Sequence, residues 1–89
     1  MKKVTFSPTF QKKLAQLQKK DQKLFEKVKK QFVLFKKHAH HPSLRLHKLK
    51  GELQDVWSFS VTMDFRLLFV EDSTYYFFDM GRHDEVYKK

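Results

Sequence analysis

The sequence predicts an α+β domain in which a short strand and an antiparallel helical hairpin precede three further strands. Two observations predict this order. Apolar residues recur at helical spacing between 7 and 37, and apolar and polar residues alternate from about 53 to 79. Helices that precede a block of consecutive strands pack on one face of an antiparallel sheet. We therefore expect a mainly antiparallel, four-stranded sheet with both helices on one face, in a single domain of residues 1–89.

The N-terminal third carries clear helix-start signals. We expect Lys3 to Phe6 to form an edge strand, followed by Ser7 as N-cap and Pro8 at the first helical position. Asp21 is expected to cap the second helix. Pro42 disfavours helical geometry in the residue before it, so the second helix ends there. The second helix carries an apolar stripe that should face the core: Leu24, Phe25, Val28, Phe32 and Phe35.

The C-terminal half predicts three strands. They are expected at about Leu53–Ser60, Thr62–Val70 and Thr74–Asp79, with Glu71–Ser73 as the turn between the last two. The segment Ser43–Leu49 is expected to be a connector that contains His47.

In the middle strand, the alternation of residues assigns side chains to two different faces of the sheet. Phe65, Leu67 and Phe69 fall on one face, which the helices should cover. Asp64 and Arg66 fall on the other face, which should be open to solvent or form a cleft.

The net charge of +9 is unevenly distributed. Residues 1–50 contain fifteen Lys/Arg and two acidic residues, whereas residues 51–89 contain four and eight. This asymmetry indicates binding to a polyanion or to an acidic protein partner, and a merely solubilising lysine surface is the alternative.

Composition excludes several classes of protein. The chain has no cysteine, so disulfides and thiolate metal sites are excluded. No apolar run approaches the roughly 20 residues needed to span a bilayer, and no apolar signal segment follows the first lysines. We expect a cytoplasmic protein without a membrane association.

Arg66 is the sharpest candidate for a functional side chain. It lies in the most apolar strand, where it either grips an anion or forms a cross-strand ion pair with Asp64 or Asp79. Planar guanidinium donors can bracket two phosphate oxygens, so Arg66 would suit a phosphate ligand, and both alternatives stay open.

A second group of candidates follows the last strand. His83 comes after Gly81 and Arg82, with Tyr87 four residues later. Histidine is the commonest general acid or base because its imidazole titrates near neutral pH, although a lone surface histidine is usually inert. His47 precedes the first long strand and could reach the mouth of a cleft.

The remaining histidines and aromatic residues carry weaker signals. His38, His40 and His41 resemble a ligand cluster, but no neighbouring carboxylate or cysteine completes a set, so we expect no metal and no cofactor. Trp57 and Tyr76 could stack on bases if exposed, but most aromatic residues in so small a domain are buried.

Taken in order, these segments resemble the RelE/ParE superfamily of toxins from toxin–antitoxin systems, and within it the YafQ-like or RelE/StbE-like mRNA interferases. The resemblance covers nearly the whole chain. It rests on the basic helical hairpin and four motifs: His47-Lys48-Leu49-Lys50-Gly51-Glu52-Leu53, Val56-Trp57-Ser58-Phe59, Asp64-Phe65-Arg66-Leu67-Leu68-Phe69 and Asp79-Met80-Gly81-Arg82-His83-Asp84-Glu85-Val86-Tyr87.

The resemblance implies a metal-independent endoribonuclease that cuts mRNA codons in the ribosomal A site and is silenced by a co-expressed antitoxin. It implies catalytic roles for His47, Asp64, Arg66, His83 and Tyr87. Which residue acts as general base and which as general acid stays open at this point.

The resemblance also implies residues that hold the RNA. Arg82 is expected to hold phosphate together with Arg66, Phe65 is expected to orient bases, and Lys48 and Lys50 are expected to contact the RNA. The arginine that YafQ-like members have near the last strand corresponds to Asp79, and Phe65 replaces their tryptophan. A further histidine between Trp57 and Asp64 has no counterpart.

Two other functions fit the same fold. A ParE-like toxin would inhibit DNA gyrase without a nuclease site, and a catalytically inactive module would only bind nucleic acid or antitoxin. The Arg–His cluster argues against the first, whereas charge alone does not distinguish binding from catalysis.

Overall fold

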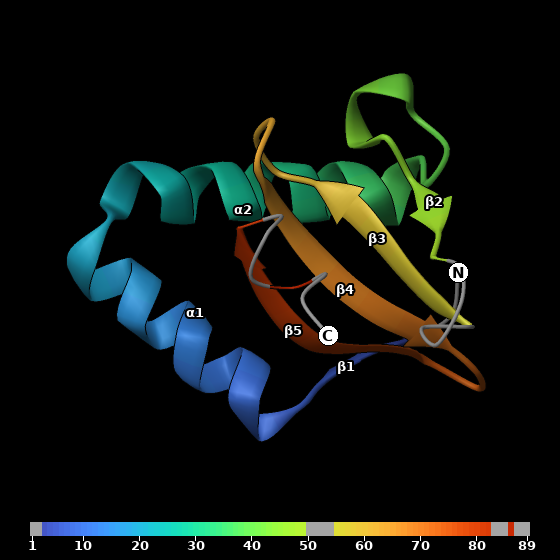
Figure 1. Ribbon diagram of the computed structural model, residues 1–89, viewed down its shortest axis with the longest axis horizontal. Helices are drawn as coiled ribbons and strands as arrows, with labels where there is room; N and C mark the ends of the chain where they lie inside the picture. The colour runs from blue at the N-terminus through green and yellow to red at the C-terminus, as the bar shows by residue number, and fades with distance from the viewer. Residues whose placement is uncertain (1–2, 50–54, 83–85, 87–89) are drawn as a thin grey trace.

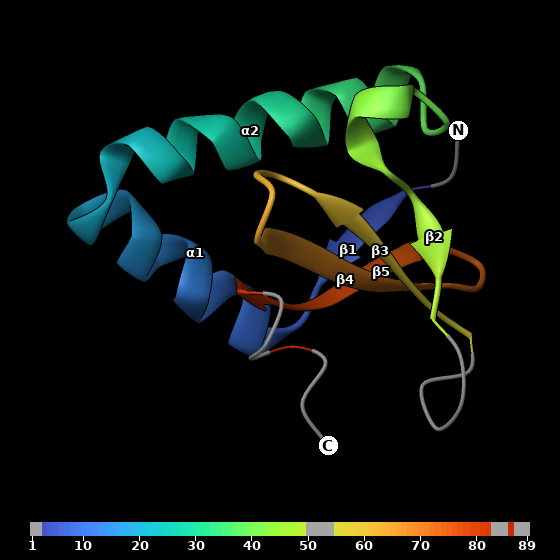
Figure 2. The same ribbon diagram turned by 45° about the horizontal axis from the view of Figure 1, so that its top comes forward.

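The computed structural model describes residues 3–49, 55–82 and 86. Two helices lie on one side of a single sheet, so the domain has two layers (Figures 1 and 2). The elements follow in the order β1 (Val4–Phe6), α1 (Pro8–Lys20), α2 (Gln22–Lys37), a 3-10 helix η1 (Pro42–Leu44), β2 (His47–Lys48), β3 (Val56–Ser60), β4 (Phe65–Glu71) and β5 (Tyr75–Arg82).

The sheet confirms the α+β prediction and contains one more strand than expected. Its order is β1-β5-β4-β3-β2, with β1 parallel to β5 and all other neighbours antiparallel. The added strand is β2, in the segment that we expected to be a connector. His47 and Lys48 pair with the edge of β3, and two residues are too few for a strand pattern to be visible in the sequence.

The helix starts follow the sequence signals. The Ser7 side chain accepts a hydrogen bond from the Phe10 amide at 3.0 Å, and Asp21 accepts one from the Leu24 amide at 3.1 Å. Asp21 is the only residue between the two helices, which diverge from it as a V (Figure 1). The predicted break and both predicted caps are therefore confirmed.

The main core lies between the helices and the sheet. It is built largely from phenylalanines of both layers, and the rings of Phe35 and Phe59 stack with centroids 4.9 Å apart. Phe35 from the predicted stripe of α2 is 1% exposed. The helix-facing residues of the sheet include Phe59, Leu67, Phe69 and Phe77.

Two strand boundaries differ from the prediction. The strand β4 begins at Phe65, not Thr62, because residues 61–64 form a turn that is closed by a hydrogen bond from the Val61 amide to the Phe65 carbonyl. The strand β5 continues to Arg82, and its pairing with β4 shifts by one residue between Leu68 and Phe69. Such a bulge places two residues of β5 opposite Leu68 and redirects the strand end.

The face of the sheet away from the helices, here called the open face, has a small apolar cluster of its own. Val56, Leu68 and Val86 are buried there, and Val70 and Phe78 pack against them. Val86 lies beyond the end of β5 in the sequence and packs on the open face against Val56 and Leu68. Within the described residues, no helix is long and apolar enough to cross a membrane.

Candidate active site on the open face of the sheet

Arg66 lies on the open face in the centre of β4. It is directly opposite Ser60 of β3 and Gly81 of β5, and it is only 9% exposed. Gly81 has no side chain, so the residue of β5 opposite Arg66 does not cover the Arg66 side chain. A guanidinium keeps its charge at any physiological pH, so Arg66 fixes a positive charge within the sheet surface.

His47 lies on the same face as Arg66. It is directly opposite Ser58, and Ser58 and Ser60 point to the same side of β3 because they are two residues apart. The Nδ1 atom of His47 is 3.4 Å from the Arg45 carbonyl oxygen. A carbonyl oxygen only accepts, so this contact favours a proton on Nδ1 and leaves Nε2 as the basic nitrogen of the neutral ring.

Val86 anchors the C-terminal segment against the open face. Its side chain is 9% exposed and belongs to the cluster with Val56 and Leu68. Leu68 is two residues from Arg66 on the same strand face and is opposite Ser58. Val86 thus lies close to Arg66 on the open face.

Asp64 and Arg82 are separated from Arg66, contrary to our prediction. The Arg82 Nη1 atom donates to Asp64 Oδ2 at 2.8 Å, and both side chains are 62% exposed. Arg82 is opposite Phe65, which faces the helices, so it projects to the side of the sheet away from Arg66. Asp64 lies in the 61–64 turn, where strand alternation does not apply.

A shallow pocket of about 210 Å³ on the helix side of the sheet has both Asp64 and Arg82 in its lining, with Lys23 and Lys27 of α2. The Thr62 hydroxyl donates to Asp64 Oδ1 at 3.1 Å. The Thr62 hydroxyl and, less strongly, the Arg82 guanidinium hold the pKa of Asp64 below its ordinary value, and desolvation opposes them. Asp64 is therefore engaged with Thr62 and Arg82 on the helix side of the sheet, away from Arg66.

Phe65 and Lys48 lie on the other side of the sheet from Arg66. Phe65 is 8% exposed and belongs to the core beneath the helices, so its ring is not presented to RNA on the open face. Lys48 is opposite Trp57, which packs against the same core, and its ammonium group lies 3.5 Å from Asp55. The alternation that placed Phe65 in the core also excludes it from base stacking.

Three predicted site residues fall outside the described residues: Lys50, His83 and Tyr87. The histidines at the end of α2 make local contacts. The Ser43 amide donates to His41 Nδ1 at 3.2 Å, and the rings of His38 and His41 lie edge to face. In the part of the chain that the structure describes, no group of three His, Cys, Asp or Glu is placed to hold a metal ion.

Several residues of the open face were not predicted. Ser58 and Ser60 are buried next to His47 and Arg66, and Val86 anchors the tail. The two serines do carry a sequence signal, since they are the polar positions of an otherwise apolar strand. Val86 carried none, because a single valine after a strand shows no periodicity.

No protein-family model matches the sequence, and no curated protein matches it. Solved structures do match. YafQ from E. coli shares 21% identity at a TM-score of 0.74, over 98% of this chain and 99% of that one. A copper-bound mutant toxin from Helicobacter pylori shares 26% identity at a TM-score of 0.74, over 98% of this chain and 100% of that one.

A third similar structure is a complex. The heterotetrameric YoeB-YefM toxin-antitoxin complex from Staphylococcus aureus matches with 22% identity and a TM-score of 0.73, over 93% of this chain and 98% of that one. Near-complete coverage of both partners in each comparison means that the whole architecture is shared, not one motif. The chain has the fold of the RelE/ParE-like toxin superfamily.

Proposed function

We propose that this protein is the toxin of a type II toxin–antitoxin system and that it cleaves mRNA on the ribosome as a metal-independent endoribonuclease. The observation that carries the proposal is the position of Arg66, a buried cation on the same open sheet face as His47. Its fold and the toxins that share it support the role of a toxin.

The proposed reaction needs two proton transfers and one site for negative charge. The 2′-hydroxyl of a ribose attacks the adjacent phosphorus, and a base accepts the hydroxyl proton. As the new O–P bond forms, the bond from phosphorus to the 5′-oxygen breaks, and an acid protonates that oxygen. The products are a 2′,3′-cyclic phosphate and a 5′-hydroxyl, so atoms and charges balance without an oxidant or a further reactant.

His47 and His83 are proposed as the two groups that move protons. Each general acid or base contributes roughly 10²–10⁴-fold to such a reaction. The contact between His47 Nδ1 and the Arg45 carbonyl orients the ring and directs the basic Nε2 away from the backbone. His83 is three residues before Val86 in the sequence, and the buried position of Val86 on the open face supports its assignment to this site.

Arg66 is proposed to stabilise the charge that develops on the phosphate oxygens. Because β3 and β5 flank it on both sides, its backbone is fixed before substrate binds. A preorganised cation of this kind costs no reorganisation in the transition state, which makes it more effective than a mobile surface lysine. Tyr87 directly follows Val86 and is proposed to orient a base beside this phosphate.

Binding partners follow from the charge distribution. The many exposed lysines of α1 and α2 would attach the protein to ribosomal RNA through a salt-sensitive, sequence-independent interaction. The similar YoeB-YefM complex supports neutralisation by a cognate antitoxin. An antitoxin segment with acidic residues would compete for the same basic surface.

A cell-free translation assay tests the function. We expect the purified protein to stop synthesis and to produce mRNA fragments only when ribosomes are present, and to leave supercoiling by DNA gyrase unaffected. Gyrase inhibition with intact mRNA would contradict the proposal and favour a ParE-like toxin. Absence of both effects would favour a module that only binds.

A further inference from the structure

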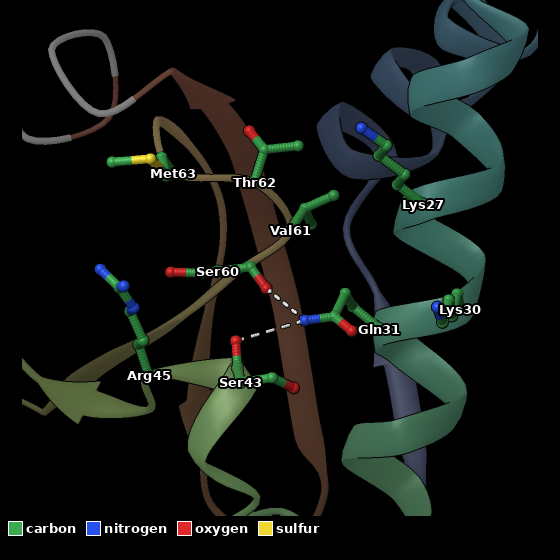
Figure 3. A pocket seen from close by; sticks show the side chains of 9 residues that line it. All are labelled: Lys27, Lys30, Gln31, Ser43, Arg45, Ser60, Val61, Thr62 and Met63. Atoms are coloured by element: carbon green, nitrogen blue, oxygen red, sulfur yellow. Dashed lines mark hydrogen bonds between the residues drawn. The ribbon is translucent and has the colours of Figure 1, made fainter.

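A polar pocket of about 480 Å³ lies between α2, the segment after η1 and the turn that joins β3 to β4 (Figure 3). Lys27 and Lys30 line it from α2, and Arg45 lines it from the opposite side. No acidic side chain is part of its lining. Three cations from two separate segments thus surround one hollow.

None of these cations is neutralised by the part of the chain that the structure describes. Within residues 3–49, 55–82 and 86, Lys27, Lys30 and Arg45 make no ion pair, whereas four other Lys and Arg side chains do. Like charges placed around one hollow repel each other, and an anion bound between them relieves that repulsion. The pocket is therefore suited to a negatively charged group.

Arg45 has an unusual backbone conformation. Its φ of 49° and ψ of 46° lie in the left-handed region, which a non-glycine residue adopts only at a cost. Its amide caps η1 through a hydrogen bond of 3.1 Å to the Pro42 carbonyl. This conformation directs the chain into β2 and places the Arg45 side chain at the pocket.

Gln31 fixes the two walls of the pocket relative to each other. Its Nε2 atom donates to the Ser60 carbonyl at 3.0 Å and to the Ser43 carbonyl at 3.5 Å (Figure 3). The amide group thereby joins α2 to both β3 and η1. A cavity whose walls are linked before binding loses less entropy when a ligand enters.

Ser60 supplies a second, independent indication of a ligand. Its side chain is 5% exposed and lines the pocket, yet its Oγ atom has no hydrogen-bond partner among the described residues. Figure 3 shows the hydroxyl directed away from Gln31, toward the side on which Arg45 lies. Buried hydroxyls are normally paired, and an anionic oxygen would accept this proton.

The position of Ser60 connects the pocket to the proposed catalytic surface. Ser60 is directly opposite Arg66, so the two sites adjoin across one strand pair. No aromatic side chain lines the pocket, and Met63 at its edge is 85% exposed. Protein partners are usually anchored by buried aromatic or aliphatic side chains, whereas backbone phosphates are bound by cations and hydroxyls alone.

We propose that Lys27, Lys30, Arg45 and the Ser60 hydroxyl form a second phosphate-binding subsite for single-stranded RNA, adjacent to the Arg66 surface and separate from it. The inference rests on the proposed function for the identity of the ligand. It adds a site that holds a phosphate next to the reacting one and so fixes the direction of the RNA strand across the open face.

Fluorescence anisotropy with a labelled, fully 2′-O-methylated oligoribonucleotide tests the subsite without cleavage. We expect the Lys27→Ala/Arg45→Ala variant to bind at least about tenfold more weakly than wild type. Log K for binding falls with the logarithm of the salt concentration, and the magnitude of that slope should decrease by about 0.7 if one phosphate contact is lost. The matched control, Lys12→Ala/Lys37→Ala, removes the same charge from exposed helix positions outside the described pockets. It measures the general electrostatic contribution of the helix lysines, so it should weaken binding clearly less than the pocket variant does.

Ser60→Ala separates a ligand-binding role from a structural one. Because the Ser60 hydroxyl has no partner among the described residues, its removal should leave the midpoint of denaturant unfolding unchanged or raise it. We expect RNA affinity to fall about threefold or more. Lower stability with unchanged affinity would overturn this assignment.

The proposal is overturned if both double variants weaken RNA binding equally, or if only an acidic peptide, probed as hexaglutamate, loses affinity for the Lys27→Ala/Arg45→Ala variant. The first outcome indicates general electrostatics and the second a protein-binding site. If the protein cleaves no mRNA but binds the oligonucleotide through this pocket, the proposed function is wrong and the subsite is supported.

Discussion

Arg66 carries a full charge at a position with little access to water. Its side chain is 9% exposed between Ser60 and Gly81. Buried ionic groups are often replaced together by apolar residues of similar volume without loss of stability, so stability alone does not account for an arginine here. At the scale of the residue, removal of this charge should therefore lower activity far more than stability.

We expect Arg66→Met to keep the free energy of unfolding within about 1 kcal/mol of wild type, because the side chains have similar length and the burial cost of the charge is removed. Cleavage should fall by roughly 10²–10³-fold, the usual effect of removing one preorganised donor. Denaturant unfolding and single-turnover cleavage are measured in parallel. Arg66→Lys should retain part of the activity, and full activity of Arg66→Met would contradict the role.

Asp64 is expected to act on stability in a pH-dependent way. Its pKa is lowered below the ordinary value of 3.8, mainly by the Thr62 hydroxyl and then by Arg82. A lowered pKa means that the ionised carboxylate stabilises the folded state above the ordinary pKa, and that this stabilisation is lost as the pH falls through the lowered value. Asp64→Asn should therefore lower the thermal midpoint slightly at pH 7, and this difference should shrink as the pH falls below the ordinary value of 3.8.

The control for Asp64→Asn is the same comparison in high salt. The pair with Arg82 is exposed, so added salt should shrink the difference at pH 7. A difference between the two proteins that persists at acidic pH would show that the substitution acts through another effect.

At the scale of elements, the start of α1 connects the helix layer to the sheet. The Ser7 hydroxyl donates to the Phe78 carbonyl at 2.9 Å and accepts from the Phe10 amide, and the Ser7 backbone amide donates to Phe77. We expect Ser7→Ala to lower the free energy of unfolding by about 2 kcal/mol, since it removes a cap and leaves a partly buried carbonyl unsatisfied.

The second helix provides the matched comparison for Ser7. Asp21 caps α2 through a single exposed hydrogen bond, so Asp21→Ala should cost only about 1 kcal/mol. Denaturant titrations of the two variants measure the difference. Equal losses would mean that the contact from Ser7 to β5 contributes nothing to stability.

The C-terminal segment is the element on which the proposed site depends most. We expect Val86→Ala to lower the free energy of unfolding by only about 1–2 kcal/mol, because the main core on the other sheet face is unaffected. Cleavage should fall at least tenfold, since the anchor that positions His83 and Tyr87 is weakened. Val33→Ala, at a valine that is 50% exposed on α2, is the control and should leave both quantities near wild type.

The sequence predicted those elements whose signals are local. The caps at Ser7 and Asp21, four of the five stripe residues of α2 and the helix-facing set Phe65, Leu67 and Phe69 of β4 all arise from neighbours within a few residues, and these are confirmed. The strand β2 was missed because two residues show no period. Arg82 and Asp64 were assigned to the wrong surface because the start of β4 depends on the turn hydrogen bonds of Thr62 and Val61.

The candidate site was predictable in its residue types and less so in its geometry. Arg66 and His47 lie on one face, as their motifs implied, although only the pairing of β2 with β3 brings His47 there. Arg45 and Ser60 belong to no motif that points to a ligand. They were not predicted because they line a pocket formed by segments about 30 residues apart in the sequence. Contacts of this kind are set by tertiary packing and not by local sequence.

At the scale of the whole molecule, the two sheet faces serve different purposes. The helix-facing side contains the phenylalanine core, and the open face presents His47, Arg66 and the anchored tail. The basic pocket lies at the border of the two layers. An RNA strand that follows the open face would pass Arg66 and reach this pocket while the lysine-rich helices contact the ribosome.

The most direct test of the central claim is the rate of ribosome-dependent mRNA cleavage by His47→Ala, compared with wild type and with His40→Ala. His40 is an exposed histidine after α2 and serves as the matched control. We predict fragments with 5′-hydroxyl ends, a rate for His47→Ala that is lower by about 10²–10⁴-fold, and wild-type rates for His40→Ala. Cleavage by His47→Ala at the wild-type rate would contradict the assignment of the open face as the active site.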